Sequence, residues 1–401
     1  MVRRRSPYLV GLTRNTFLLA AGSFFADVST EMLYPILPIF LTQTLHASGS
    51  IVGLIEGTAQ ATQNIVQGIS GSLSDRLRKH KTIAMVGFVA AALAKPLIGI
   101  ATAWPGVFGA RLLDRVGTGT RSAPRDALVA ESVDEEYRGR AFGLEGFGDN
   151  AGAFFGPLLA IALLFWLQAG FRTIFLVAVI PGLLAFVMVA LVRERPVAVA
   201  AEATINISPR RLPASYWKYL LVTVIFGIGN SSNSFLILQT RDIGASLPLT
   251  IFIYAGFNLA AALISYPAGS LSDRWGRKNL LLVAYAIFLV AYLGFALSRD
   301  LAVVAVAFTG YGLFQGMFRA VGKAYASDFA PAGLHASAIG WYNATVGLVG
   351  LFASVVAGLL WDRVGHTAVF FLGAFSAAAG CVALVILIGV PPSRSPTLAS
   401  V

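Results

Sequence analysis

The stretch Gly-Ser-Leu-Ser-Asp-Arg occupies residues 71–76 and returns letter for letter at residues 269–274, an offset of 198 positions. A weaker echo relates residues 138–143 to residues 335–340 at an offset of 197. Self-similarity that keeps one register over half a chain indicates a duplicated structural unit. The 401-residue chain is therefore predicted to consist of two homologous halves.

Both copies lie among apolar runs of about 20 residues, the length that crosses a hydrocarbon layer ~30 Å thick. The chain is 57% hydrophobic and only 12% charged, which is unusual for a soluble protein. We predict an all-α membrane protein of twelve transmembrane helices in two pseudo-symmetric six-helix bundles. The predicted spans are 15–41, 50–73, 82–101, 104–124, 140–166, 172–192, 217–239, 249–271, 279–297, 301–322, 337–360 and 367–390.

The interruption between the halves predicts the domain boundaries. Residues 1–192 are expected to form the N-terminal bundle, 193–216 a cytoplasmic linker and 217–401 the C-terminal bundle. The linker has three prolines and no long apolar run, which is typical of a loop. Two such bundles predict a central site near the bilayer midplane that opens to one side at a time.

The formal net charge of +11 is spread over alternate loops and does not form one basic patch. If the N-terminus is cytoplasmic, 23 Lys and Arg residues fall on the inside, 4 fall on the outside and 3 lie within spans. This asymmetry predicts cytoplasmic termini by the positive-inside rule. We predict a multi-pass protein of the bacterial inner membrane whose partners are lipid and small molecules, with no nucleic-acid partner.

The repeated stretch, followed by basic residues, resembles the loop motif of the major facilitator superfamily. The resemblance implies a transporter fold and a gate at the cytoplasmic face. There, an acid contacts a helix N-terminus or an arginine. Plain topogenic charge is the alternative reading of the basic residues. The implied gating residues are Gly71, Asp75, Arg76, Arg138, Arg140, Gly269, Asp273 and Arg274.

Two further stretches carry the resemblance. Residues 152–157 (Gly-Ala-Phe-Phe-Gly-Pro) resemble the antiporter signature of the family, although Ala160 replaces its usual final glycine. Small residues such as Gly152 and Gly156 allow close helix contact, and Pro157 bends a helix. Residues 34–38 (Tyr-Pro-Ile-Leu-Pro) resemble the opening of the twelve-span drug:proton antiporter branch. Efflux by antiport is the implied activity, and simple helix packing is the alternative.

Nine ionisable side chains lie away from the ends of the predicted spans, all in the N-terminal half. Each costs about 2.5 to 3.5 kcal/mol at the centre of a span, so a functional or paired role is expected. Six of these side chains are acids and three are bases, so full ionisation would leave an excess of negative charge. We therefore expect one or more carboxylates to be protonated near neutral pH. The nine are Asp27, Glu31, Glu56, Lys95, Arg111, Asp114, Arg115, Glu145 and Asp149.

Spacing groups six of these charges into pairs that share a helix face. Asp27 and Glu31, Arg111 and Arg115, and Glu145 and Asp149 are each four residues apart. We expect Asp27 and Glu31 to be the proton-coupling or cation-binding acids and Asp149 the next candidate, with Arg111 and Arg115 close beside them. Fixed salt bridges between the first-span acids and these arginines are the alternative.

Neutral polar and aromatic groups dominate the spans of the C-terminal half and are suited to recognising a solute by hydrogen bonding and stacking. Interhelical hydrogen bonds explain part of the same pattern. The predicted cavity-lining residues are Glu56, Gln60, Asn230, Asn233, Asn258, Gln315, Trp341 and Asn343.

These patterns predict a proton-coupled secondary transporter that exports a small lipophilic or cationic solute in exchange for protons. The alternatives are a metal-cation exporter and a proton-coupled importer of an organic anion held by Arg111 and Arg115. The sequence lacks nucleotide-binding and hydrolase motifs, and Cys381 is its single cysteine. We therefore expect no enzyme, no metal site and no cofactor beyond the proton gradient, and a monomer suffices for this architecture.

Overall fold

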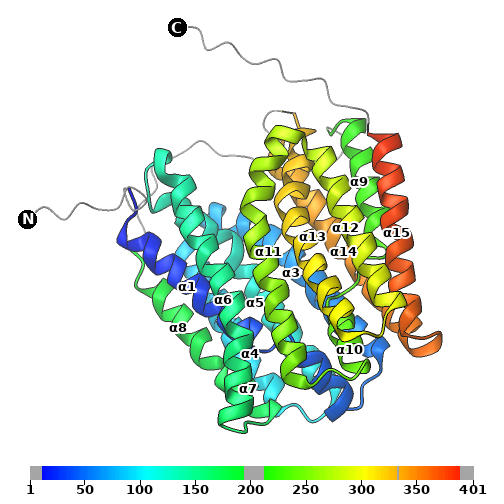
Figure 1. The fold of residues 1–401 in the computed structure, drawn as a ribbon. Coiled ribbons are helices and arrows are strands. Elements are labelled where there is room, and N and C mark those ends of the chain that lie inside the picture. The colour runs from blue at the N-terminus through cyan, green and yellow to red at the C-terminus, as the bar shows by residue number, and fades with distance from the viewer. Residues whose placement is uncertain (1–10, 194–211, 332–333, 389–401) are drawn as a thin grey trace, which may run out of the picture.

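A computed structural model describes residues 11–193, 212–331 and 334–388, which fold into helices joined by short connections (Figure 1). The predicted linker falls largely outside the described residues. The helical elements are α1 (Arg14–Glu31), α2 (Leu37–Ile39), η2 (Phe40–Thr44), α3 (Gly49–Leu77), α4 (His80–Ile100), α5 (Trp104–Glu131), η3 (Glu135–Tyr137), α6 (Arg138–Trp166), α7 (Phe171–Val177), α8 (Val179–Ala190), α9 (Ala214–Gly227), α10 (Ser234–Asp242), α11 (Leu247–Trp275), α12 (Arg277–Leu297), α13 (Leu301–Asp328), α14 (His335–Arg363) and α15 (His366–Leu387).

These elements form twelve spans, which confirms the predicted all-α fold. The first span continues from α1 through α2 and η2, the sixth joins α7 to α8, and the seventh joins α9 to α10. Eight helical stretches are long and apolar enough to cross a membrane by length and composition. The other four spans are interrupted, as in α1 and α9, or carry buried charges, as in α3 and α5.

Two spans are longer than predicted. Helix α5 continues to Glu131 and α13 to Asp328, beyond the predicted ends at 124 and 322. The added helical turns are polar, so spans that are predicted from apolar runs end before the helices do. Arg121, Arg125, Arg319 and Lys323, counted above among the cytoplasmic bases, therefore lie within helices.

The first span of each half is broken at an equivalent place. Helix α1 ends at Glu31 before the residues around Pro35, and α9 ends at Gly227 before the polar stretch 229–233. At the offset of 198 residues, Tyr34 aligns with Ser232. The repeat seen in the sequence therefore extends to these irregular segments. Discontinuous spans expose backbone and polar side chains near the membrane midplane, where transported solutes bind in many transporters.

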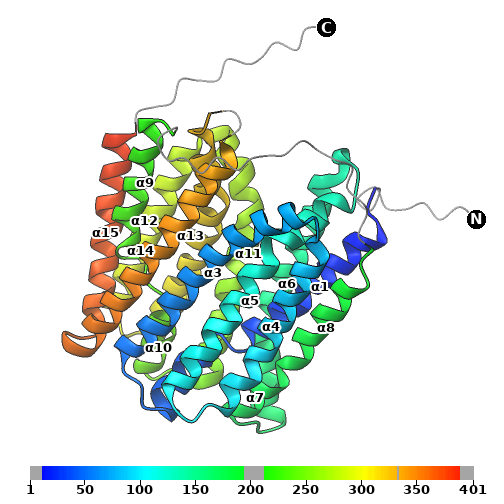
Figure 2. The same cartoon turned by 180° about the vertical axis from the view of Figure 1, so that it is seen from behind.

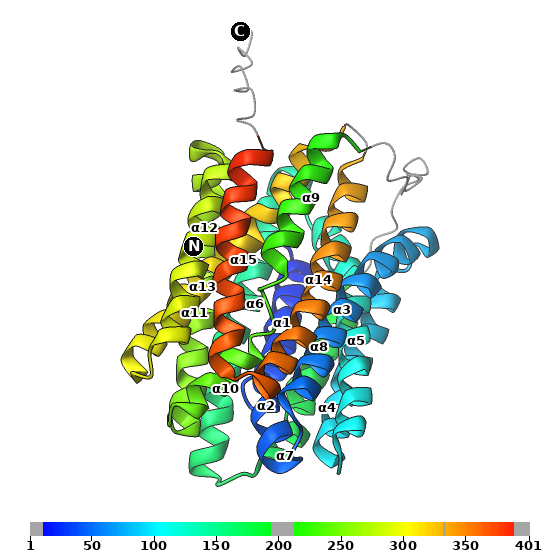
Figure 3. The ribbon, with the colours of Figure 1, turned by 90° about the vertical axis from the view of Figure 1, so that its right-hand side faces the viewer.

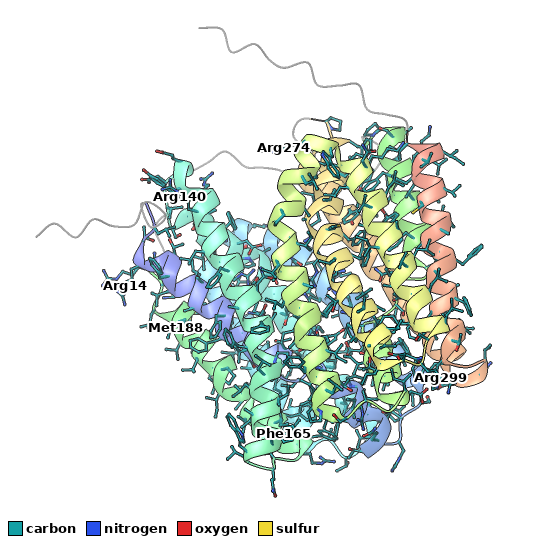
Figure 4. All side chains as sticks on the ribbon, viewed as in Figure 1. Arg14, Arg140, Phe165, Met188, Arg274 and Arg299 are labelled. Atoms are coloured by element: carbon teal, nitrogen blue, oxygen red, sulfur yellow. The ribbon has the colours of Figure 1, made fainter. Side chains whose placement is uncertain are left out.

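Two groups of helices, α1–α8 and α9–α15, lie side by side (Figure 2). The starts of α1 and α9 and the end of α15 lie at one end of the molecule, which we call the terminal end. Arg14, Arg140 and Arg274 lie at this end, whereas Phe165 and Arg299 lie at the opposite end (Figure 4). In Figure 1 the N-terminal helices α1 and α6 lean away from α11 toward the terminal end.

The halves touch along α3 and α14, which lie side by side (Figure 3). A Cβ atom added at Gly53 would lie 2.0 Å from the Ser354 carbonyl oxygen, and one at Gly57 would lie 3.0 Å from Leu351 Cα. Glycine is therefore required for this close approach. Further toward the terminal end, a Cβ atom at Gly68 would meet open space. The two halves are thus in contact at the opposite end and diverge toward the terminal end.

An acid of one half caps a helix of the other half at the opposite end. The backbone N–H groups of Gly49 and Ser50, at the start of α3, each donate to Asp362 of α14 at 2.8 Å. The carboxylate satisfies N–H groups that have no partner within α3 and lies at the positive end of its dipole.

The core of the C-terminal half is aromatic. The rings of Phe226 and Tyr285 stack with centroids 4.0 Å apart, and those of Phe288 and Tyr292 stack at 3.9 Å. All four side chains are fully buried. The corresponding interior of the N-terminal half holds charged networks instead, so the two bundles share a topology and differ in chemistry.

Candidate functional site

A row of glycines on α6 holds the first-span acids in place. Added Cβ atoms at Gly152 and Gly156 would lie 2.4 Å and 2.9 Å from the carbonyl oxygens of Phe24 and Val28 on α1. The same atoms would lie 2.9 Å from Asp27 Cβ and 3.0 Å from Glu31 Cβ. The antiporter-like residues Gly152 and Gly156 therefore pack directly behind Asp27 and Glu31. Gly148, one turn earlier and not singled out from the sequence, packs on Ala20 in the same way. Pro157 follows inside α6.

A first charged network links α3, α4 and α5. Arg111 donates to both carboxylate oxygens of Glu56 at 2.9 Å and to Asp114 at 2.8 Å. Lys95 donates to the second oxygen of Asp114 at 3.0 Å, and Arg115 Nη2 lies 3.1 Å from Asp114. These five residues are 1–7% exposed. A network this well paired and this deeply buried is fixed, because removing one partner leaves an uncompensated charge.

This network gives Arg111 and Arg115 ion-pair partners other than the first-span acids. They were expected beside Asp27 and Glu31, but their carboxylate partners are Glu56 and Asp114. The physical reason is that Asp114 lies on the same helix, one turn from Arg111 and next to Arg115. Glu56 was expected to line the cavity and is instead bonded within this network.

A second network joins α1, α5 and α6, and it contains two bases that were missed. Arg125 Nη2 lies 2.9 Å from Glu145 and 3.1 Å from Asp126, while Nη1 lies 3.3 Å from Asp149. Three carboxylates thus share one guanidinium group. Their spacing in the sequence could have identified them, because Arg121 and Arg125 are four residues apart, like the other charged pairs.

Arg121 is the less completely bonded of the two bases. Its Nη2 atom lies 3.8 Å from Asp27 Oδ1, and its guanidinium group lies over the Phe88 ring at 4.7 Å. Among the described residues, its Nε and Nη1 atoms have no hydrogen-bond partner, although Arg121 is only 5% exposed. The Asp27 side chain is 27% exposed. Asp27 is therefore a loosely paired acid that solvent reaches.

Glu31 connects the two halves through neutral groups. Its Oε2 atom accepts hydrogen bonds from Tyr254 at 2.8 Å and from Asn258 at 3.3 Å, both on α11. The Tyr254 ring stacks on Tyr34, at the break of the first span, with centroids 5.5 Å apart. Within the described part of the chain, Glu31 forms no salt bridge. Its bonds to the other half therefore depend on its own protonation state.

The break between α9 and α10 gathers three of the predicted cavity-lining residues. Tyr311 of α13 donates to Asn233 at 2.7 Å and to Asn230 at 3.4 Å. Asn233 donates in turn to Gln315 at 3.4 Å. The polar groups of the C-terminal half therefore converge on a broken span, which the sequence signalled by the run of Asn and Ser at 230–234.

Three other predicted lining residues lie elsewhere. Gln60 donates to Asn64, which donates to the Asn343 carbonyl oxygen, so these groups join α3 to α14. Trp341 packs edge-on against Trp217, with ring centroids 6.3 Å apart.

The gating motif stays a prediction. The side chains of Asp75 and Asp273 lie outside the described part of the structure. Arg76 and Arg274 are exposed near the terminal ends of α3 and α11, where Gly71 and Gly269 also lie in the last two turns. The predicted partners Arg138 and Arg140 are exposed at the start of α6. Among the described residues, no group of three or more His, Cys, Asp or Glu is placed to hold a metal ion.

Comparisons with known proteins agree with this architecture. The family model described as Major Facilitator Superfamily matches residues 19–228 and 219–401. An uncharacterised MFS-type transporter of Methanocaldococcus jannaschii is 34% identical over 87% of this chain and 89% of its own. A probable 4-methylmuconolactone transporter of Cupriavidus pinatubonensis is 25% identical over 88% and 85%. The crystal structure of the nucleoside transporter NupG superimposes with a TM-score of 0.77 at 12% identity, covering 94% of this chain and 100% of the other.

Proposed function

Because the chain belongs to the Major Facilitator Superfamily and is a multi-pass secondary transporter, we propose that it exports a small lipophilic or cationic solute in exchange for protons. In this proposal the terminal end is the cytoplasmic face, as the distribution of Lys and Arg predicts. The monomer is the working unit, located in the bacterial inner membrane.

Glu31 carries the proposal. An ionised carboxylate accepts several hydrogen bonds, whereas a protonated one gives up acceptor capacity and becomes a donor. Proton binding at Glu31 would therefore weaken its bonds to Tyr254 and Asn258 and loosen the contact between the halves. Asp27, one turn away and partly exposed, offers a second carboxylate to a proton or a cationic solute.

The charges of the N-terminal half support a cationic solute over an anionic one. Arg111 is bonded on three nitrogens to Glu56 and Asp114 and is therefore committed to the protein. Asp27, Asp126 and Asp149 remain partly exposed, with side chains 27%, 44% and 33% exposed. A cation entering this region meets an excess of carboxylate.

Drug and metal susceptibility of an efflux-deficient host tests the proposal. We expect the wild type to protect against at least one lipophilic cation, and Glu31→Gln and Asp27→Asn to abolish that protection at equal membrane levels. Asp134→Asn, on an exposed loop, is the matched control and should behave as wild type.

A second measurement separates exchange from other kinds of protection. In inverted vesicles, adding the protective compound should release protons from the wild type and not from Glu31→Gln. If the protein protects only against metal salts, the metal-cation exporter replaces the proposal. If it protects against no compound and takes up an organic anion, the importer replaces it.

A further inference from the structure

A small cavity lies inside the N-terminal bundle, where α1, α4, α5 and α8 meet. Its volume of about 10 Å³ is close to that of one water-sized particle. Small residues such as Ala26, Ala92 and Gly182 leave this space, and the cations Lys95 and Arg121 line it. All five residues are buried. The cavity therefore belongs to the interior of the bundle, and no acid of the described part of the chain lines it.

The two cations that line the cavity have unused hydrogen-bond donors. Among the described residues, Arg121 Nε and Nη1 have no hydrogen-bond partner, and Nη2 lies 3.8 Å from Asp27 Oδ1. The Lys95 ammonium group has three donors, and it donates to the Ala91 carbonyl oxygen and to Asp114, both at 3.0 Å. A buried donor without an acceptor is unfavourable, so we expect the cavity to hold an acceptor.

The chemistry of the lining favours an anion over a water molecule as this acceptor. A water molecule accepts hydrogen bonds but must also place its own two hydrogens on acceptors. The charged groups around the cavity are donors only, because Arg and Lys side chains have no acceptor atom. An anion accepts from every side and has no hydrogen to place.

The buried charges next to the cavity are also unbalanced. The network of α3, α4 and α5 joins three bases, Lys95, Arg111 and Arg115, to only two acids. The acids of the second network gather around Arg125 instead. A net positive charge in the interior is unfavourable unless a counter-charge lies nearby. A monovalent anion beside Lys95 would supply that counter-charge.

The second half of the repeat fills the corresponding place with aromatic rings. Gly182 and Gly380 are 198 residues apart. A Cβ atom added at Gly182 would lie 3.1 Å from Ser29 Oγ of α1. One added at Gly380 would lie 3.0 Å from Phe226 Cβ of α9, and the Phe226 ring contacts Phe288 of α12 with centroids 5.0 Å apart. The N-terminal half thus keeps a polar space where the other half has a packed aromatic core.

We propose that the cavity binds a monatomic anion, chloride in the first instance, through Arg121 and Lys95. Its volume leaves no room for sulfate, phosphate or a carboxylate solute. Bound there, the anion shares the Arg121 charge with Asp27, whose carboxylate stays loosely paired and open to solvent. The proposal concerns a structural ion and does not rest on the proposed function, so either can fail without the other.

Chloride-dependent stability tests the site in the purified full-length protein. Thermal unfolding in detergent is followed in sodium gluconate, chloride or bromide at one ionic strength. Chloride and bromide should each raise the unfolding temperature along a saturating curve, by about 1 to 3 °C at roughly ten times the dissociation constant. Equal unfolding temperatures in the three salts would overturn the proposal.

Two glycine variants separate this site from binding at the surface. In Gly182→Ala the new methyl group lies 3.0 Å from Ala92 Cβ and reaches into the space between Ala92 and Ser29, so the halide effect should disappear. Gly109→Ala, on α5 with no atom within 4 Å of the added Cβ, is the matched control and should keep the effect. A halide effect of wild-type size in Gly182→Ala would place the ion elsewhere and overturn the assignment.

Crystals of the wild type grown in bromide give an answer even if Gly182→Ala fails to fold. An anomalous-scattering peak beside Arg121 and Lys95 is the expected result. Density at this position without an anomalous signal would show a water molecule, and the proposal would then be wrong.

Discussion

At the scale of single residues, the buried charges fall into two classes that their spacing does not distinguish. Glu56, Arg111 and Asp114 satisfy one another and are nearly inaccessible. Asp27 and Glu31 keep weak or neutral partners and lie where solvent or the other half reaches them. The first class stabilises the bundle, and in our proposal the second class changes its proton occupancy.

The first class predicts a large stability effect. Glu56→Gln should lower the free energy of unfolding by about 3 to 5 kcal/mol, because Arg111 keeps its charge and loses a bidentate partner. Thermal unfolding in detergent, followed by size-exclusion chromatography, measures this loss. The double variant Glu56→Gln with Arg111→Gln should recover much of it, and a double variant as unstable as the single would contradict this explanation.

At the scale of helices, glycines set how closely elements approach. The α6 row at Gly148, Gly152 and Gly156 brings the backbone of α6 onto α1, and Gly49, Gly53 and Gly57 do the same between α3 and α14. Both rows repeat every four residues, the spacing that places small side chains on one face.

A substitution pair on one helix tests this role. Gly152→Ala should destabilise the protein by about 1 to 3 kcal/mol and reduce transport, because the new methyl group overlaps the Phe24 carbonyl oxygen. Gly146→Ala, two turns away and facing open space, should be neutral or stabilise by up to about 1 kcal/mol. Equal effects of the two variants on unfolding temperature would show that contact with α1 is not the cause.

Sequence patterns predicted the helices far better than the contacts between them. Each apolar run became a span because length and hydropathy act locally. The pairing of Arg111 with Glu56 joins residues 55 positions apart on different helices, and only their packing decides it. Arg121 and Arg125 were missed because polar turns extend α5 beyond its apolar run. Asp27 and Glu31 were chosen as candidates because a carboxylate inside an apolar run stands out.

At the scale of the whole molecule, one contact between α3 and α14 holds the two halves together at the opposite end. The cap that Asp362 makes on α3 holds the opposite end shut. Loss of this cap should therefore favour opening of the molecule at the opposite end.

The cap predicts a variant that opens the opposite end. Ser354 is 3% exposed in the contact between α3 and α14, so in a Cys381→Ala background a membrane-impermeant maleimide labels Ser354→Cys when these helices separate. Asp362→Ala should speed this labelling several-fold, because a lost helix cap costs about 0.5 to 2 kcal/mol. Asp300→Ala removes a cap within the C-terminal half and should leave the rate unchanged. An unchanged rate in Asp362→Ala would show that this cap does not hold the opposite end shut.

The unequal charges of the two bundles also bear on ancestry. If the duplicated unit once worked as a pair of identical subunits, both facing walls carried the same charges, because a two-fold interface presents one patch to itself. Facing walls of different charge are impossible in such a pair. In that case the charged networks of the N-terminal half and the aromatic core of the C-terminal half became different only after the two copies ceased to be identical.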